Sequence, residues 1–318
     1  MKKQLISVVV PIFNEELGVV KFLKDELLPE LERLPYKTEV VLVDDGSQDK
    51  TLEKISAIDY KANIKIVVFS KNFGKEVALA AGIFYAEGDA IIMIDADGQH
   101  PAKAIPQLIK KWEDGADVVT ALRGQNTTRH KIGSRIYYRI LRMMGIKNIV
   151  PGELDFRLIS RAVADEYNRF TEHNRLTRGL INWLGFQQEY IQVETRGRIG
   201  GRPTYSFKKL MALAGDSMVS MSRTPLTIFG YIGLMITIVS LVFGLFILIQ
   251  QYILGDPLGL DWSGAVAMSV FVSFLVGLVL ISQAITALYV AQIHVETKNR
   301  PLFVVNKKKS VGIGENEQ

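Results

Sequence analysis

Asp95 and Asp97 stand one residue apart, directly after an apolar run over residues 90–94 that has the length and composition of a buried strand. Because side chains alternate along a strand, we expect both carboxylates to point the same way at its carboxyl end. Two carboxylates this close repel each other unless a cation lies between them. Hard divalent ions such as Mg²⁺ or Mn²⁺ are bound by one or two carboxylates together with phosphate oxygens. The pair therefore predicts a divalent-cation site, and a polar turn that happens to carry two aspartates is the alternative.

Further strands and helices are predicted around this pair. Mostly apolar stretches typical of buried strands occur over residues 5–10, 39–43, 64–69 and 118–122, and helix-like stretches over residues 17–34, 51–62 and 76–86. Strands that alternate with helices form a mostly parallel, doubly wound α/β sheet, in which ligands bind at the carboxyl ends of the strands. The sequence therefore predicts a ligand crevice at the edge where Asp95 and Asp97 lie.

Composition narrows the classes of partner. The chain has 318 residues, a formal net charge of +5 and no cysteine, so disulfides and thiol catalysis are excluded. Its basic residues cluster over residues 129–142 and near the end of the chain. An anionic lipid surface or a lipid phosphate explains this distribution better than nucleic acid does, and we expect no nucleic-acid partner.

Two long runs near the end of the chain contain no Asp, Glu, Lys or Arg. They cover residues 224–255 and 262–293, and a span of the hydrocarbon core needs about 20 residues. Basic residues flank the pair of runs and the turn between them has none, which places both termini on the cytoplasmic side. We therefore expect a two-helix transmembrane hairpin at the inner (plasma) membrane, and a buried helical hairpin is the alternative.

The predicted organisation follows from these segments. We expect a catalytic α/β domain, an amphipathic juxtamembrane helix, a first span, a short external loop, a second span and a cytoplasmic tail over residues 1–205, 206–223, 224–254, 255–261, 262–293 and 294–318. The polar end of the chain, after about Lys307, is expected to be mobile.

Four polar motifs follow predicted strands in a fixed order. They read Pro11-x-Phe13-Asn14-Glu15, Val43-Asp44-Asp45-Gly46-Ser47-x-Asp49-x-Thr51, Asn72-Phe73-Gly74-Lys75 and Asp95-Ala96-Asp97-Gly98-Gln99-His100-Pro101. Further matching segments are Asp155-Phe156-Arg157-Leu158, Arg198 to Tyr205, and Glu296-x-Lys298-x-Arg300-Pro301. With these motifs, residues from about 5 to 305 resemble the inverting nucleotide-sugar glycosyltransferases of the GT-A fold, in particular the branch that acts on dolichyl or undecaprenyl phosphate and includes the bactoprenol glucosyltransferases.

The resemblance implies a reaction and a donor site. The implied reaction is a metal-dependent, inverting transfer of a hexose from a nucleotide sugar, UDP-glucose first, to a polyprenyl phosphate. It implies metal contacts at Asp95, Asp97 and Gln99. It implies donor contacts at Pro11, Phe13, Glu15, Val43, Asp44, Asp45, Asn72, Lys75, Asp95, Ala96, Gln99, Arg198 and Arg202. For the acidic residues after residue 43, capping of the helix that begins near Thr51 is the alternative, and Ser47 or Asp49 is expected to cap it.

The resemblance also implies how the acceptor is held. Arg123 matches the position that grips the acceptor phosphate, with Lys131 and Ser134 beside it, and a planar guanidinium suits paired phosphate oxygens. Asp155 matches the base of relatives with hydroxyl acceptors, and here it either acts as a base or orients Arg123 or another cation. One departure is Thr204, which stands where the branch has a lysine, and Arg202 could supply that charge.

Several alternatives remain open at this point. The donor could be GDP-mannose or a UDP-linked amino sugar. A processive polysaccharide synthase is disfavoured because the chain lacks a Gln-x-x-Arg-Trp motif. A non-catalytic scaffold is disfavoured because Asp97 and Arg123 are both present. The resemblance also implies a homo-oligomer.

Overall fold

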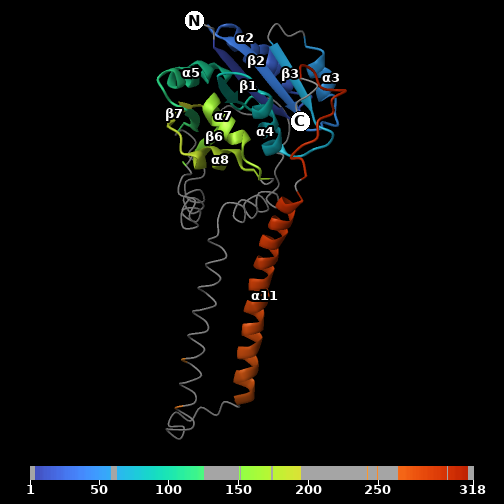
Figure 1. Cartoon of the computed structure of the whole chain (residues 1–318), viewed down its shortest axis with the longest axis vertical. Coiled ribbons are helices and arrows are strands. Elements are labelled where there is room, and N and C mark those ends of the chain that lie inside the picture. The colour runs from blue at the N-terminus through green and yellow to red at the C-terminus, as the bar shows by residue number, and fades with distance from the viewer. Residues whose placement is uncertain are drawn as a thin grey trace. The chain divides into compact units, whose positions relative to one another are not determined.

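A computed structural model describes residues 4–58, 63–124, 150, 152–172, 175–194, 242, 249, 264–298 and 300–313. The chain divides into two compact units, one made of residues 1–139, 147–206 and 300–318 and the other of residues 140–146 and 207–299. The described elements of the first unit are β1 (Leu5–Ile12), α1 (Val19–Lys21), η1 (Phe22–Leu27), α2 (Leu28–Glu32), β2 (Lys37–Asp44), α3 (Thr51–Ser56), β3 (Asn63–Val68), α4 (Lys75–Tyr85), β4 (Ala90–Met93), η2 (Ala102–Ala104), α5 (Ile105–Glu113), β5 (Val118–Arg123), β6 (Glu153–Ser160), α7 (Arg161–Asn168), α8 (Thr177–Leu184) and β7 (Gln188–Val193) (Figure 1).

The first unit is built on a seven-stranded sheet in the order β3-β2-β1-β4-β6-β5-β7. Strands β3, β2, β1 and β4 pair in parallel, β6 runs antiparallel to both β4 and β5, and β7 is parallel to β5. The predicted α/β class and mostly parallel sheet are therefore confirmed. The antiparallel β6 is an addition to the prediction, and it brings the start of β6 to the edge where the parallel strands end.

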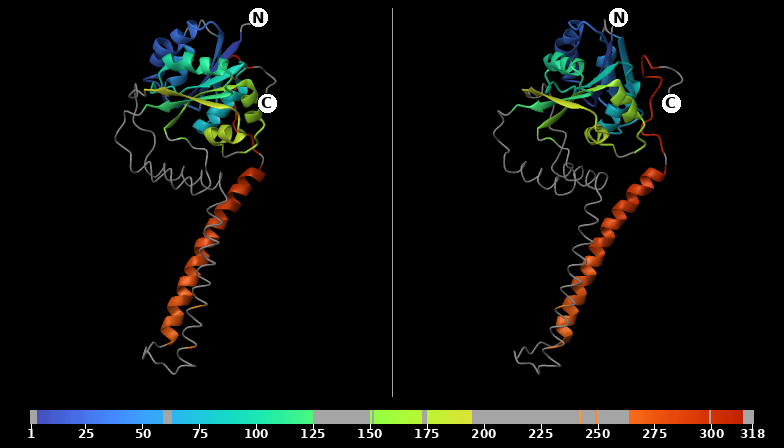
Figure 2. Two further views of the ribbon diagram at one scale, coloured as in Figure 1. Left: turned by 90° about the vertical axis from the view of Figure 1, so that its left-hand side faces the viewer. Right: turned by 60° about the vertical axis from the view of Figure 1, so that its left-hand side comes forward.

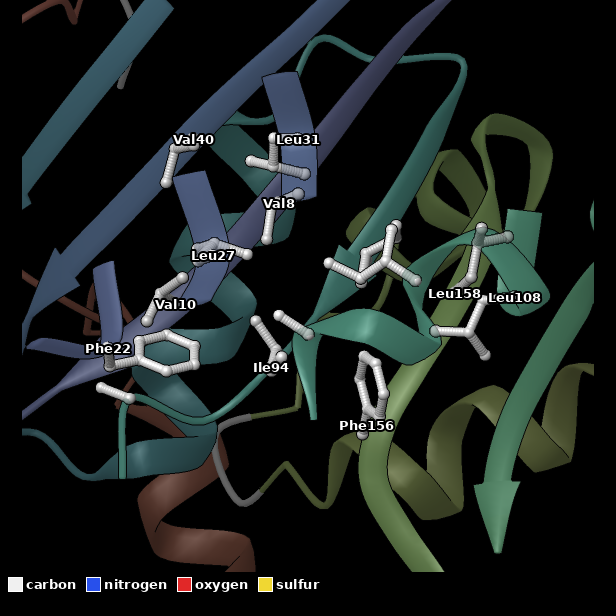
Figure 3. Packing of buried hydrophobic residues seen from close by; sticks show 14 of the residues in the cluster. Val8, Val10, Phe22, Leu27, Leu31, Val40, Ile94, Leu108, Phe156 and Leu158 are labelled. Carbon is white, nitrogen blue, oxygen red and sulfur yellow. The ribbon is translucent and has the colours of Figure 1, made fainter. Parts of the chain in front are cut away.

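Apolar side chains cover both faces of the sheet. Alternate residues of β1 enter different clusters, with Val8 and Val10 on one face and Val9 on the other. The first face packs against α1, η1, α2, α3 and α5, as the close view in Figure 3 shows for Phe22, Leu27 and Leu108. The second face packs against α4, α7 and α8. Figure 2 shows helices on either side of the sheet, which is the doubly wound arrangement.

The first predicted helix, over residues 17–34, is divided into three pieces. A π-helical turn, η1, separates α1 from α2, and Pro29 lies in the first turn of α2. Proline has no N–H to give to the preceding turn, so the hydrogen-bond register changes just before it. The predicted helix from Thr51 is also shorter than expected, because α3 ends at Ser56.

The end of the chain binds to the sheet instead of being mobile. Val305 and Val311 form antiparallel bridges with Phe69 and Ile66 beside the edge strand β3 (Figure 1). The Phe303 ring stacks on the Phe69 ring with centroids 5.3 Å apart. The expected mobility after Lys307 is therefore wrong for residues up to 313, because backbone pairing and apolar contacts to β3 outweigh the polar composition that suggested it.

The second unit contains α11 (Gly264–Thr297), a helix of 34 residues. Among the residues that the structure describes, no helix combines the length and the hydropathy that crossing a membrane requires. The predicted transmembrane hairpin is therefore wrong for the described structure, and the inner-membrane localisation that depended on it loses its basis. The prediction counted missing charges, which is a weaker criterion than sustained hydropathy along one long helix. Three predicted segments lie outside the described residues: the amphipathic segment, the external loop and the first span, except for residues 242 and 249 of that span.

Candidate active site

The loops that follow β1 and β2 are held together by side-chain hydrogen bonds. The Asn14 N–H donates to Ser47 Oγ at 3.0 Å, and Asn14 Oδ1 accepts from the Gln48 N–H at 2.9 Å. The Glu15 N–H donates to Thr51 Oγ1 at 2.9 Å. Asn14 has a positive φ of 52°, a conformation that asparagine tolerates better than most residues. The two loops therefore form one polar surface at the carboxyl edge of the sheet.

Asp45 connects this surface to the loop after β3. Its two carboxylate oxygens accept from the Phe73 N–H at 2.7 Å and from the Gly74 N–H at 2.9 Å, and its side chain is only 2% exposed. Gly46 makes the approach possible, because a Cβ there would lie 2.5 Å from the backbone carbon of Lys71. Asp45 thus fixes the loop that leads into Lys75. Burial raises the pKa of Asp45 to about 6, although the two N–H donors act in the opposite direction.

Lys75 bridges two carboxylates, one just after β4 and one in β6. Its Nζ lies 2.7 Å from Asp95 Oδ1 and 3.0 Å from Asp155 Oδ2. Met93 faces Arg157 in the antiparallel register of β4 and β6, so two residues further along Asp95 comes opposite Asp155. Arg178, from α8, contacts the other side of Asp155, with Nη2 2.7 Å from Oδ1. The site is therefore a chain of alternating charges.

The neighbouring charges in this series determine the protonation of Asp155 and Lys75. Burial alone would raise the pKa of Asp155, but the Lys75 and Arg178 cations outweigh it and hold that pKa well below its usual range. Burial alone would lower the pKa of Lys75, but Asp95 and Asp155 raise it. The Lys75 ammonium and the Asp155 carboxylate are thus charged at neutral pH, and Asp155 is a very weak proton acceptor.

Asp97 and His100 lie in the same segment after β4 as Asp95. Asp97 Oδ1 accepts from the Gln99 N–H at 3.0 Å, and Gly98 between them has a φ of +71°. His100 is buried, stacks on Phe156 with centroids 5.7 Å apart, and has Nδ1 3.9 Å from Asp95 Oδ2. Burial lowers the pKa of His100, although Asp95 and Asp97 oppose this shift. His100 is therefore neutral at pH 7.

The donor set fits a hard divalent cation only in part. Within the described part of the chain, no three His, Cys, Asp or Glu side chains converge on one metal position. Asp95 and Asp97 supply the oxygen atoms that Mg²⁺ and Mn²⁺ prefer, and such ions complete their coordination with water and substrate phosphates. The residues are thus compatible with a cation that also needs the substrate, and not with a self-sufficient metal cage.

The predicted site residues fall into four groups. Phe13, Glu15, Asp44, Asp45, Lys75, Asp95, Asp97, Gln99 and Asp155 lie at the carboxyl edge on the connected loops and strand ends. Pro11, Val43 and Ala96 are buried in the core at the same edge. Asn72 and Arg123 are exposed there, and the Arg123 N–H donates to the Gly152 carbonyl at 2.9 Å. Lys131, Ser134, Arg198 and Arg202 lie outside the described residues. The roles of all these residues remain predictions.

Of the two residues expected to cap α3, only Asp49 accepts a hydrogen bond from the start of that helix. Asp49 Oδ1 accepts from the Thr51 N–H at 2.9 Å, whereas Ser47 uses its hydroxyl to accept from Asn14. Asp44 is 1% exposed and accepts from the Ser47 N–H at 3.3 Å. Burial raises the pKa of Asp44, and the hydrogen bonds from Ser47 oppose the shift.

Sequence reasoning missed three charged side chains around the site. Arg178 pairs with Asp155, and Glu76 Oε2 accepts from the Thr177 N–H at 2.8 Å, which docks the start of α8 onto α4. Arg157 is 2% exposed, and its Nη2 lies 3.5 Å from Glu153 Oε1. No local pattern indicates the first two contacts, because they join α8 to β6 and to α4, whereas Arg157 and Glu153 lie four residues apart in the same strand, β6.

A seven-stranded mixed sheet that gathers carboxylates at the carboxyl edge of its parallel strands is a GT-A-like fold. Residues 7–170 match the family described as Glycosyl transferase family 2. An uncharacterized glycosyltransferase of Synechocystis is 36% identical, covering 95% of this chain and 94% of that protein. A bactoprenol glucosyl transferase of Shigella phage SfX is 35% identical, covering 96% of this chain and 99% of that protein.

Among solved structures, glucosyl-3-phosphoglycerate synthase from Mycobacterium tuberculosis in complex with phosphoglyceric acid is similar, with 19% identity and a TM-score of 0.48. That similarity covers 70% of this chain and 79% of the solved one. The family match and the near full-length relatives agree with each other. The chain belongs to glycosyl transferase family 2.

Proposed function

We propose that this protein transfers a glucosyl residue from UDP-glucose to a polyprenyl phosphate, with inversion at the anomeric carbon. The observation that carries the proposal is the similarity, over 96% of the chain, to proteins named bactoprenol glucosyl transferase. A partial match would support only the nucleotide-sugar half of the reaction. The similarity over 96% of the chain also includes the regions outside the sheet, and therefore supports the lipid-phosphate half of the reaction as well.

The charge chain of the site suits a phosphate acceptor. An oxygen of the acceptor phosphate attacks the anomeric carbon, the bond from that carbon to the diphosphate breaks, and UDP leaves with the bonding electrons. No proton is transferred, because a phosphate monoester is already largely ionised at neutral pH. A hydroxyl acceptor would need a base, whereas Asp155 is paired with both Lys75 and Arg178 and is a poor base. The weak basicity of Asp155 therefore favours a phosphate acceptor over a hydroxyl acceptor.

The residues then divide between donor and acceptor. Asp95, Asp97 and Gln99 would hold Mg²⁺ or Mn²⁺, whose chemistry when bound is to neutralise the charge of the leaving diphosphate. Arg123, exposed at the end of β5, binds the acceptor phosphate through its planar guanidinium.

The donor loops supply the nucleoside contacts. The loops after β1 and β2 present Phe13, Glu15 and Asp44 at the carboxyl edge, and nucleoside binding is assigned to that surface. Asp45 uses both carboxylate oxygens on backbone N–H groups of the next loop. Its role is therefore to position that loop rather than to touch the nucleoside.

A transfer assay tests the proposal. The full chain in detergent is incubated with undecaprenyl phosphate, Mn²⁺ or Mg²⁺ and labelled UDP-glucose, with labelled GDP-mannose and UDP-N-acetylglucosamine in parallel. We expect label in the organic phase from UDP-glucose, in a β-linked product. Asp97→Ala should lower the rate by at least about 100-fold, and the exposed Asp114→Ala serves as the matched control.

Each other outcome has a defined meaning. Label in the organic phase from GDP-mannose alone, or from UDP-N-acetylglucosamine alone, would show that the proposed donor is wrong and that the proposed acceptor is right. No lipid-linked product from any donor would refute the transfer reaction. Equal rates for Asp97→Ala and the wild type would remove the cation site from the mechanism.

A further inference from the structure

Lys75 occupies a position that its own helix disfavours. It is the first residue of α4, which is 11 residues long, and a cation at a helix N-terminus faces the positive end of the helix dipole. Gly74 before it has a φ of +103°, and the Gly74 N–H is held by Asp45. The loop therefore directs Lys75 to this place in spite of the dipole. Its ion pairs with Asp95 and Asp155 explain the placement.

The two partners of Lys75 differ in what else they contact. Asp155 has a second cation, because Arg178 Nη2 lies 2.7 Å from its Oδ1. Asp95 has as its other charged or titratable neighbour, among the described residues, His100 at 3.9 Å. At 3.9 Å the imidazole is too far from that carboxylate for a hydrogen bond. If the ammonium moved, Asp155 would keep a counter-ion and Asp95 would not.

Asp95 is also one of the two carboxylates assigned to the divalent cation. An ammonium 2.7 Å from Asp95 Oδ1 and 2.9 Å from Oδ2 takes both oxygens of that ligand. The cation and the ammonium cannot both lie in contact with the same carboxylate without strong repulsion. Binding of one must therefore weaken binding of the other.

We propose that Lys75 is a built-in competitor of the divalent cation at Asp95, so that the cation binds well only when a nucleotide diphosphate supplies further oxygen ligands. This inference rests on the proposed function for the identity of the cation site. The ion pairs of Lys75 then determine the order in which the nucleotide and the divalent cation bind. A site without Lys75 would capture the cation before the donor arrives.

The experiment measures Mn²⁺ binding and does not depend on transfer. Free Mn²⁺ is quantified by electron paramagnetic resonance during titration of the full chain, without nucleotide, for the wild type, Lys75→Met and Lys75→Arg. We expect Lys75→Met to bind Mn²⁺ at least about tenfold more tightly, equivalent to about 1.4 kcal/mol, and Lys75→Arg to bind as weakly as the wild type. With saturating UDP the difference should shrink to about threefold or less, because the diphosphate supplies ligands to both proteins.

Lys71→Met is the matched control, because Lys71 lies in the same loop, with Nζ 5.0 Å from the Phe73 ring centroid. We expect it to change Mn²⁺ affinity by less than about twofold, since exposed charges are screened. An equal gain in Lys71→Met would mean that any lost positive charge strengthens binding, and would overturn the proposal. Equal Mn²⁺ affinities in the wild type and Lys75→Met would also overturn it.

A measurement on the wild type covers the case in which Lys75→Met does not fold. Acylation of Lys75 by an amine-reactive reagent is followed by mass spectrometry with and without saturating Mn²⁺. We expect at least about threefold faster labelling of Lys75 with Mn²⁺, because the amine is released from its contact with the Asp95 carboxylate, and no change at Lys71. An unchanged rate at Lys75 refutes the competition. Neither readout uses lipid or sugar. The transfer assay can therefore fail while Lys75 is shown to compete with Mn²⁺, and the competition can be refuted while transfer is observed.

Discussion

Replacing Asp45 with asparagine tests whether burial or hydrogen bonding controls the loop that carries Lys75. Asp45 is 2% exposed and accepts two backbone hydrogen bonds, from Phe73 at 2.7 Å and from Gly74 at 2.9 Å. Asparagine keeps the shape and one acceptor oxygen, but its NH₂ group meets the other N–H as a second donor. The substitution therefore removes one hydrogen bond and the buried charge together.

The size of the effect follows from the pKa of Asp45. Burial raises it from the ordinary 3.8 to about 6, so the ionised carboxylate is disfavoured in the folded protein. Stability from this group is complete below pH 3.8 and falls as the pH rises through about 6, because the folded state then holds the proton more tightly than the unfolded state. The full loss is about 3 kcal/mol, of which about 2 kcal/mol falls between pH 4.5 and 7. The asparagine variant lacks this loss.

The assay is urea unfolding of the wild type and Asp45→Asn at pH 4.5 and pH 7, with Asp114→Asn as the exposed control. We expect the stability of the wild type relative to Asp45→Asn to fall by about 2 kcal/mol between the two pH values. The control should show a change of less than about 0.5 kcal/mol. A relative stability that stays constant or grows with pH would show that the two N–H donors outweigh burial, and the reasoning would be refuted.

Three further predictions test the acceptor, the base and the end of the chain. Arg123→Lys should raise the KM for polyprenyl phosphate about tenfold and leave the KM for UDP-glucose unchanged; equal changes in both would remove Arg123 from the acceptor site. Asp155→Asn should lower kcat but keep the shape of the pH–rate profile between pH 6 and 8, and loss of an ionisation in that range would restore a base role. Phe303→Ala should lower the free energy of unfolding by about 1–2 kcal/mol through the lost stacking on Phe69, measured by urea denaturation; an unchanged midpoint would show that the contact is not maintained in solution.

The sheet was predictable because its strands carry their own signal. Continuous apolar runs such as residues 40–43 and 90–94 fall in β2 and at β4, and their central positions are fully buried. The motif residues follow these runs directly, so their place at the carboxyl edge follows from strand direction alone. The sequence could not predict that β6 is antiparallel, since pairing direction depends on neighbours distant in the chain.

The contacts within the site were less predictable than its location. Asp155 was expected either to act as a base or to orient Arg123 or another cation, and the cations that it contacts are Lys75 and Arg178. The Asp155–Arg178 contact depends on where α7 and the following loop return α8 to the sheet. The polar tail after Lys307 was misjudged for the same reason, because pairing with β3, which is distant in the sequence, holds the segment around Val311 in place.

The polar contacts of the donor half form a series in which each loop positions the next. Ser47 holds the loop after β1, Asp45 holds the loop after β3, and that loop delivers Lys75 to Asp95. The far end of the same loop is fixed from outside the sheet, because the Ser70 N–H donates to the Val304 carbonyl at 2.9 Å. A segment more than 200 residues away in sequence therefore anchors the start of the loop that leads into Lys75. The ion pair between Lys75 and Asp95 thus depends on backbone contacts at both ends of one short loop, and the position of Lys75 depends on the whole edge of the sheet.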